Sequence, residues 1–561
     1  MIMGQATPVR DRFRHRRLQR LQIAWPVAAG IVAAVVATPI LVVLSSLCTP
    51  SLDVWSHLWQ TQLPRLIGNT LALIGGVGAG VAVVGTGLAW LVTRYRFPGQ
   101  AVFAWLLVLP LAMPAYVIGF VFLAMFDYAG PVQSWLRQMF GRALWLPDIA
   151  SYGGLVLVMT LVFYPYVYML ARTAFLEQSR TLLEAAQTLG TKRRAVFWRV
   201  ALPLARPSIA AGITLALMET LADFGTVALF NYPTFTVAVY RVWFGFFNRP
   251  AATQLASLLL LFTVTLYGLE RTMRGRARFY QTPGSVHPVP AKRLTGWRAW
   301  AASGVTGLMV SVAFCLPVAQ LLLWTVTTVG KADYDSRYPE FMGNTLFVAL
   351  LTAIVTVGTA VVVAYGLRLS RSRVVVLCGR LASMGYALPG SVIAVGVLVP
   401  LAFLDHTLDS WVRTGWGIST GLLLTGSLFG LVFAYLVRFL AISCQTVEAS
   451  LAKITPSMDM AGRSLGVGPG GVLWRIHLPL IRSGLCSAAI LVFVDVMKEL
   501  PATLLLRPFG YDTLAVRVWQ LTSESFWKAA ALPALTIVGV GILPVLVLVR
   551  SSVRPHRERP A

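Results

Sequence analysis

Charge is scarce in this sequence of 561 residues, in which charged residues make up 12% and hydrophobic residues 57%. An average soluble domain is about one quarter charged, so the composition excludes an ordinary water-soluble protein. Many uncharged runs reach about 20 residues, the length that a helix needs to cross a bilayer. A transmembrane barrel would instead show segments of about 10 residues with alternating polarity. The sequence therefore predicts an all-α protein that crosses the membrane many times.

The sequence also lacks the patterns of several kinds of site. Its 5 cysteines and 6 histidines are scattered, without the spacing of a disulfide framework or a zinc site. The phosphate-binding string G-x-x-x-x-G-K followed by Ser or Thr does not occur, so the chain cannot bind ATP by that route. No nucleophile and base stand out as a pair. We expect no enzymatic activity, no cofactor and no tight metal site in this chain.

Acidic residues are the scarcer charge, 21 against 47 basic residues, which gives a net charge of +26. The basic residues lie between apolar runs, which argues for the positive-inside rule and against nucleic-acid binding. With the N-terminus in the cytoplasm, 35 basic residues fall on that side of twelve spans and 11 on the other. Both termini are therefore expected in the cytoplasm. The predicted spans are 23–47, 66–92, 101–125, 151–171, 208–230, 251–270, 299–326, 344–367, 382–404, 418–437, 485–506 and 529–549.

The two halves of the chain repeat each other. Asn69-Thr70-Leu71 recurs as Asn344-Thr345-Leu346, and Trp198–Leu204 recurs as Trp474–Leu480, at offsets of 275 and 276 residues. A shared offset over such a distance indicates duplication. Six spans in each half make the repeats parallel in the membrane. The expected organisation is a basic tail (1–22), a first half (23–270), a basic linker (271–298), a second half (299–549) and a second basic tail (550–561).

A matching polar loop, 172–207 in the first half and 438–484 in the second, separates the fourth and fifth spans. The first copy contains Glu184–Gly190 and the second Met460–Gly466, each followed by Trp-Arg and Leu-Pro-Leu. The pattern predicts a short helix stopped by glycine and a second helical piece. These loops resemble the EAA loops of the permeases of binding-protein-dependent ABC importers.

That resemblance implies a type I importer permease whose loops couple to two copies of a separate ABC ATP-binding subunit. ATP and Mg would bind on those partner subunits, and a periplasmic solute-binding protein would deliver the ligand at the bacterial inner membrane. Membrane lipid is the other expected partner. Met460 stands where the family usually has glutamate, and Asp459 precedes it. The coupling residues implied by the resemblance are Glu184, Ala185, Gly190, Ala461 and Gly466.

Two predicted spans carry paired acids. Glu219 and Asp223 in the fifth span align with Asp495 and Glu499 in the eleventh. A spacing of four residues puts each pair on one face of a helix. A charge in mid-membrane costs about 2.5–3.5 kcal/mol, so we expect these groups to face the interior and line a translocation pathway. Two structural alternatives are that Lys498 neutralises its neighbour Asp495 and that the acids are solvated at the ends of their spans.

The strings around these acids resemble the fused permeases of ferric-iron importers, and the resemblance covers about residues 66–550. Gly225 and Pro501 follow the acids at equivalent places and predict a bend in each helix. Carboxylate oxygens suit a hard trivalent cation. Ferric iron is therefore the expected substrate, with thiamine, phosphonate or another small solute as alternatives. A proton-coupled secondary transporter is the less favoured architecture.

Arg241 and Arg517 lie at equivalent positions in outer loops, each beside a tryptophan. Interfacial anchoring by the tryptophans explains the position of both residues. Alternatively, both arginines dock an acidic patch of the periplasmic binding protein.

Overall fold

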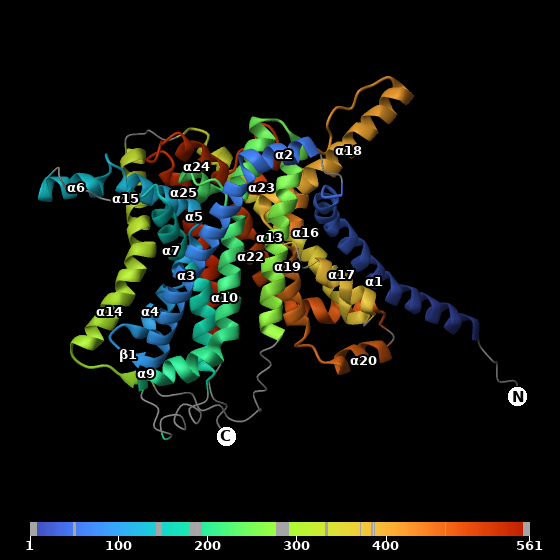
Figure 1. Ribbon diagram of the computed structural model, residues 1–561. Helices are drawn as coiled ribbons and strands as arrows, with labels where there is room; N and C mark the ends of the chain where they lie inside the picture. Colours follow the sequence, from blue (N-terminus) through green and yellow to red (C-terminus); the bar gives the residue numbers. More distant parts are fainter. Residues whose placement is uncertain are drawn as a thin grey trace, which may run out of the picture.

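The computed structural model describes residues 8–48, 52–141, 148–178, 188, 193–275, 291–330, 335–370, 372–382, 385, 388–465 and 467–553. Eleven of its helices are long and apolar enough to cross a membrane, which confirms the predicted all-α polytopic fold. The last predicted span, 529–549, is helix α25, whose described apolar stretch Ala531–Leu546 is shorter. Most long helices run side by side through one bundle (Figure 1).

The elements of the first half begin with a long N-terminal helix and end with α13. In chain order they are α1 (Pro8–Ser45), α2 (Leu52–Thr61), α3 (Leu63–Arg94), β1 (Tyr95–Arg96), α4 (Gln100–Leu106), η1 (Leu109–Ala112), α5 (Ala115–Phe126), α6 (Pro131–Phe140), α7 (Tyr152–Leu176), α9 (Arg193–Val196), η2 (Phe197–Ala201), α10 (Leu202–Ala222), α11 (Gly225–Leu229), α12 (Phe235–Tyr240), η3 (Arg241–Gly245) and α13 (Arg249–Gly275).

The second half follows a similar order. Its elements are β2 (Lys292–Arg293), α14 (Trp297–Val310), η4 (Ser311–Cys315), α15 (Leu316–Gly330), α16 (Tyr338–Leu369), α17 (Arg373–Ala382), α18 (Gly390–Trp416), α19 (Leu428–Leu451), α20 (Pro456–Ser464), α21 (Pro469–Val472), η6 (Leu473–His477), α22 (Leu478–Met497), α23 (Pro501–Leu506), α24 (Leu514–Ser523) and α25 (Ala531–Val553). The two-residue strands β1 and β2 pair in parallel.

Matching contacts confirm the internal repeat. The Asn69 side chain donates to the carbonyl of Pro233, and the equivalent Asn344 donates to the carbonyl of Asp512. A tyrosine hydroxyl in turn donates to the backbone carbonyl of each asparagine. The π-helical segments η2 and η6 also occupy equivalent positions after the polar loops. The duplication seen in the sequence is therefore a duplication of local structure.

The first helix of each half packs on the other half. Helix α1 contacts α16, α17 and α18, whereas α14 contacts α4 and α15 contacts α5. The approach is close, because a Cβ on Gly396 of α18 would lie 2.4 Å from the carbonyl oxygen of Pro39 in α1. Because the first helices of each half pack on the other half, helices of both halves surround the interface between them. A pathway between the halves can therefore form in the middle of the bundle.

Two predicted spans differ from the structure in ways that matter for the site. The third span, 101–125, is divided into α4, η1 and α5, because Pro110 and Pro114 cannot continue a regular helix. The tenth span was predicted at 418–437, but the helix is α19, Leu428–Leu451. The shift brings Arg438, expected at the membrane boundary, into the middle of a membrane-spanning helix.

Glycines of α3 allow it to pack closely against α7. A Cβ on Gly85 would lie 2.7 Å from Cβ of Val167 and 2.9 Å from the carbonyl oxygen of Tyr164. Gly76 and Gly80 also lack room for a Cβ, whereas Gly87 faces open space. Close helix packing is therefore present at some of the glycines of this helix and absent at others.

Gly85→Ala is expected to destabilise the protein by about 1–3 kcal/mol, because overpacking displaces the α7 backbone. Gly87→Ala is the matched control in the same helix, since its new methyl group meets nothing within 4 Å. Thermal unfolding of the two purified variants in one detergent checks the prediction. Equal melting temperatures would contradict the close contact between α3 and α7.

Candidate translocation and coupling sites

Two membrane helices are interrupted at equivalent places beside the predicted acids. Helix α10 ends at Ala222 and α11 begins at Gly225, whereas α22 ends at Met497 and α23 begins at Pro501. The bends predicted from Gly225 and Pro501 are therefore complete breaks. A Cβ on Gly225 would lie 2.7 Å from Cβ of Tyr116, so this position also needs glycine for space.

Two of the acids cap the short helices that follow the breaks. Asp223 accepts hydrogen bonds from the backbone N–H groups of Thr226 and Val227, at 2.9 and 3.2 Å, and from the Thr226 hydroxyl at 2.9 Å. Glu499 accepts one from the N–H of Ala502 at 3.3 Å. Carboxylates at these positions satisfy free N–H groups and complement the helix dipole. These two acids thus have a structural role that the sequence analysis missed, although Asp shortly before the start of a helix is a capping signal.

Two basic side chains lie beside the carboxyl groups at the helix breaks. Arg438 of α19 lies 3.3 Å from Glu499, and both side chains are buried. Lys498 lies 2.8 Å from Asp495, so the alternative in which these two neutralise each other holds for this pair. Glu219 is within electrostatic range of Asp223, Lys498 and Glu499. The cluster therefore contains four carboxyl groups and two basic groups.

A cavity of about 100 Å³ lies at this cluster, and we call it the inner chamber. Both halves contribute to its lining, since residues of η1, α5, α7 and α10 face residues around the second helix break. The Tyr116 hydroxyl is buried there with no hydrogen-bond partner among the described residues. The charged residues that line the chamber are Glu219, Asp223, Arg438, Lys498 and Glu499. Three of the four predicted pathway acids thus meet in one cavity, and Asp495 is held by Lys498.

A larger cavity, of about 940 Å³, lies between the halves and is lined in part by α24. This helix lies at the upper end of the bundle in Figure 1. We call this larger cavity the outer cavity. It is lined by residues such as Arg65, Asp127 and Tyr232, and it reaches the surface at exposed positions such as Ser523. Arg241, one of the two predicted docking arginines, is exposed and lines it as well. This arginine therefore faces the mouth of the space between the halves.

The equivalent arginine, Arg517, is tied to the protein itself. Its guanidinium lies 2.6 Å from the Asp335 carboxylate and 5.5 Å from the ring of Phe341. Partial burial raises the pKa of Asp335, but the N–H of Arg337 and the charges of Arg517 and Arg337 outweigh it and hold the pKa below its ordinary value. The pair thus stays ionised at neutral pH and weakens only when acid protonates Asp335.

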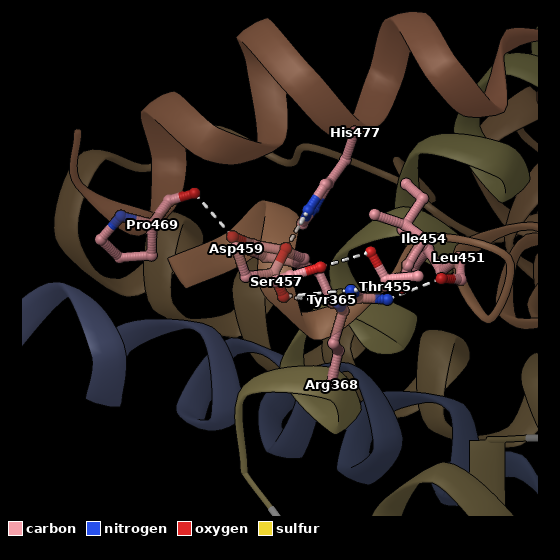
Figure 2. Close-up of polar contacts among 9 residues, drawn as sticks. All are labelled: Tyr365, Arg368, Leu451, Ile454, Thr455, Ser457, Asp459, Pro469 and His477. Carbon is pink, nitrogen blue, oxygen red and sulfur yellow. Dashed lines mark hydrogen bonds and ion pairs between the residues drawn. The ribbon is translucent and has the colours of Figure 1, made fainter. Parts of the chain in front are cut away.

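The second polar loop is anchored by a charged cluster, which Figure 2 shows. Asp459 of α20 lies 3.0 Å from Arg368 at the end of α16 and 2.6 Å from the ring of His477 in η6. Arg368 also donates to the backbone carbonyls of Leu451 and Ile454, at 2.6 and 3.0 Å, where α19 ends. We call Arg368, Asp459 and His477 the loop clamp. It ties α20 to two membrane helices and to the segment that enters α22.

The second polar loop also has a face that is exposed and apolar. Ala461 is exposed, and Met460 and Leu465 have exposed fractions of 64% and 82%. Trp474 and its counterpart in the first loop, Trp198, are exposed as well, at equivalent positions. Such a surface is typical of a contact with another protein. The other predicted coupling residues, Glu184, Ala185, Gly190 and Gly466, lie outside the described residues.

Comparisons with known proteins agree with this architecture. Residues 82–278 match the family model of the binding-protein-dependent transport system inner membrane component. The Fe(3+)-transport system permease protein FbpB 2 of Haemophilus influenzae is 28% identical over 494 residues, which cover 88% of this chain and 90% of the relative. The putative ferric transport system permease protein FbpB 1 of the same organism is 25% identical over 490 residues, 82% of this chain and 73% of the relative.

A third relative aligns with only part of this chain. The molybdenum transport system permease protein ModB of Escherichia coli is 30% identical over 210 residues, which cover 37% of this chain and 88% of the relative. A relative that aligns along most of its own length with about a third of this chain agrees with the internal duplication. The chain belongs to the family of inner-membrane components of binding-protein-dependent transport systems.

Proposed function

We propose that this chain forms the membrane pathway of an ATP-driven importer of ferric iron. The observation that carries the proposal is the inner chamber, where three carboxyl groups and two basic groups meet between the two halves, with the fourth acid, Asp495, paired to Lys498 beside it. An excess of carboxylates attracts a hard cation and opposes an anion such as phosphonate. The ferric permeases that align with most of the chain support the same substrate.

The contacts of these acids suit a transport pathway better than a tight ion-binding site. Asp223 is engaged by a helix N-terminus, Asp495 by Lys498, and Glu499 by both a helix N-terminus and Arg438, so these three acids do not form a ready-made ligand set. A transport path must bind weakly enough for the ion to leave. Glu219, Asp223, Asp495 and Glu499 would therefore lower the cost of passage without holding the ion tightly.

The exposed face of the second loop would bind one of two ATP-binding subunits. ATP and Mg would act on those subunits, and the loop clamp would pass their movement to α16, α19 and α22. Ala461 and the exposed Met460 and Leu465 lie on the face available for this contact. Glu184, Ala185, Gly190 and Gly466 complete the proposed coupling set from the family resemblance.

A periplasmic binding protein would deliver the ion at the opposite end, where the outer cavity opens. Arg241 is exposed there and would meet an acidic patch on that protein. Arg517 would take part only after release from Asp335. Both termini would then lie in the cytoplasm, on the side of the coupling loops.

Uptake of radiolabelled ferric iron by cells with and without the chain tests the proposal. Uptake should require the chain, stop when ATP is depleted, and continue when a protonophore collapses the proton gradient while ATP stays high. Thiamine and phosphonate are the comparison substrates in the same cells. Chain-dependent uptake of either of these instead of iron would overturn the ferric assignment, and loss of uptake with the protonophore alone would favour proton coupling.

A further inference from the structure

The outer cavity and the inner chamber share one lining residue, and it is aromatic. Of the residues that the structure describes, only Phe224 lines both cavities. The residue is 3% exposed, so almost none of it is open to bulk solvent. The two cavities therefore approach each other at this residue, which lies between the outer cavity and the chamber acids.

The ring is held by aromatic contacts from both halves of the chain. Phe224 lies 4.8 Å from the Tyr240 ring and 5.0 Å from the Trp519 ring, measured between ring centroids. Tyr240 belongs to α12 of the first half, whereas Trp519 belongs to α24 of the second. These separations are typical of favourable tilted aromatic pairs. A relative movement of the two halves would therefore break one contact and preserve the other.

The backbone at Phe224 is suited to such a movement. Phe224 and Asp223 form the break between α10 and α11, and Asp223 has an extended backbone with ψ of 132°. Hinges are commonly a few residues at the ends of helices. The equivalent residue in the second half, Leu500, lines the inner chamber but not the outer cavity, and it is 1% exposed. The aromatic barrier is thus a feature of one half.

We propose that Phe224, clamped between Tyr240 and Trp519, is the gate that closes the inner chamber from the outer cavity. An apolar constriction excludes water and ions until it widens. Phe224 and Asp223 are neighbours at the helix break. A shift of this break would therefore move the gate ring and the chamber acid together. The gate rests on the proposed transport role of the chamber, but it does not depend on which solute is carried.

Cysteine labelling tests the gate without any substrate. The full chain, with its five native cysteines replaced, would carry one reporter cysteine, Ala115→Cys in the inner chamber or Ser523→Cys in the outer cavity. A membrane-impermeant methanethiosulfonate reagent is added to vesicles on the side of the outer cavity. With Phe224 intact, the outer reporter should react and the chamber reporter should not.

Phe224→Ala should raise the labelling rate of the chamber reporter by about tenfold or more, and leave the outer reporter unchanged. Phe244→Ala is the matched control, because Phe244 lines the outer cavity alone. Fast labelling of the chamber reporter with Phe224 intact would overturn the gate. So would a chamber reporter that stays protected in Phe224→Ala while the outer reporter still reacts.

Phe224→Leu keeps the experiment decisive if the alanine variant does not assemble. A smaller apolar side chain should give intermediate labelling of the chamber reporter. Protection equal to that of the parent in this variant, with the outer reporter still reactive, would also count against the gate. Failure of ferric uptake with normal gating would instead overturn the ferric assignment and leave the gate in place.

Discussion

The double variant Glu219→Gln, Asp223→Asn is expected to reduce ferric uptake by about tenfold or more. It lowers the number of carboxyl groups in the inner-chamber cluster from four to two, which equals the number of basic groups. At about 8 Å and an effective dielectric constant of about 20, one carboxylate attracts a trivalent cation by roughly 6 kcal/mol. Even a small part of that energy exceeds the roughly 1.4 kcal/mol that corresponds to a tenfold change.

The choice of residues separates charge from structure. Asn caps a helix about as well as Asp, so Asp223→Asn retains the hydrogen bond to the N–H of Thr226 and preserves the start of α11. Changing Glu499 would be less informative, because it would leave Arg438 as a buried charge without its carboxylate. Breaking a buried pair in this way costs about 3–5 kcal/mol and would confuse loss of transport with loss of folding.

The control variant is Asp409→Asn, which removes an acid of similar chemistry outside the chamber. Asp409 of α18 accepts hydrogen bonds from the N–H groups of Thr420 and Gly421, at 2.7 and 3.2 Å. Uptake by this variant should stay within about twofold of the parent, since surface substitutions have small effects. Full uptake by the chamber variant would mean that its acids serve only as caps and structural partners.

Disruption of the loop clamp is expected to separate ATP hydrolysis from transport. In Asp459→Asn, α20 loses its ion pair with Arg368, and the charged partner of His477 is lost as well. Hydrogen bonds to charged groups contribute about 1.5–3 kcal/mol each, enough to leave α20 loosely attached to α16. The number of ATP molecules hydrolysed per ion transported should rise by about tenfold, because the moving loop no longer carries α16 and α19 with it.

Arg368→Gln should have the same effect, since it removes the other side of the clamp and the contacts to the end of α19. Arg373→Gln is the matched control, an exposed arginine at the start of the neighbouring α17. The ratio is measured in vesicles that contain the assembled complex, with ATP hydrolysis and uptake followed in parallel. Tight coupling in both clamp variants would show that the cluster only stabilises the loop.

The spans and the repeat were predictable because they depend on local composition and on sequence identity at a constant offset. Asn69 and Asn344 were matched by sequence, and their hydrogen bonds match as well. Gly225 and Pro501 also indicated where the two helices bend, because both residue types change the backbone at their own position. Features that depend on the local sequence were therefore predictable.

Features that join distant segments were not predictable. Arg438 was expected at the membrane boundary, because the predicted span 418–437 ends just before it, whereas the observed helix runs from Leu428 to Leu451. The clamp joins Asp459 to a histidine 18 residues away and to an arginine 91 residues away. The gate depends on Phe224 and Trp519, which lie in different halves. No periodicity within one segment reports contacts of this kind.

ATP-driven import of ferric iron is tested most directly by the ATPase activity of the reconstituted complex with its binding protein. The permease is assembled in lipid with its ATP-binding subunit, and hydrolysis is compared for binding protein loaded with ferric iron, with thiamine or phosphonate, or left empty. Stimulation by the ferric-loaded protein alone is the expected result. Stimulation by another ligand would keep the architecture and contradict the ferric assignment, and the absence of any stimulated hydrolysis would contradict ATP-driven import.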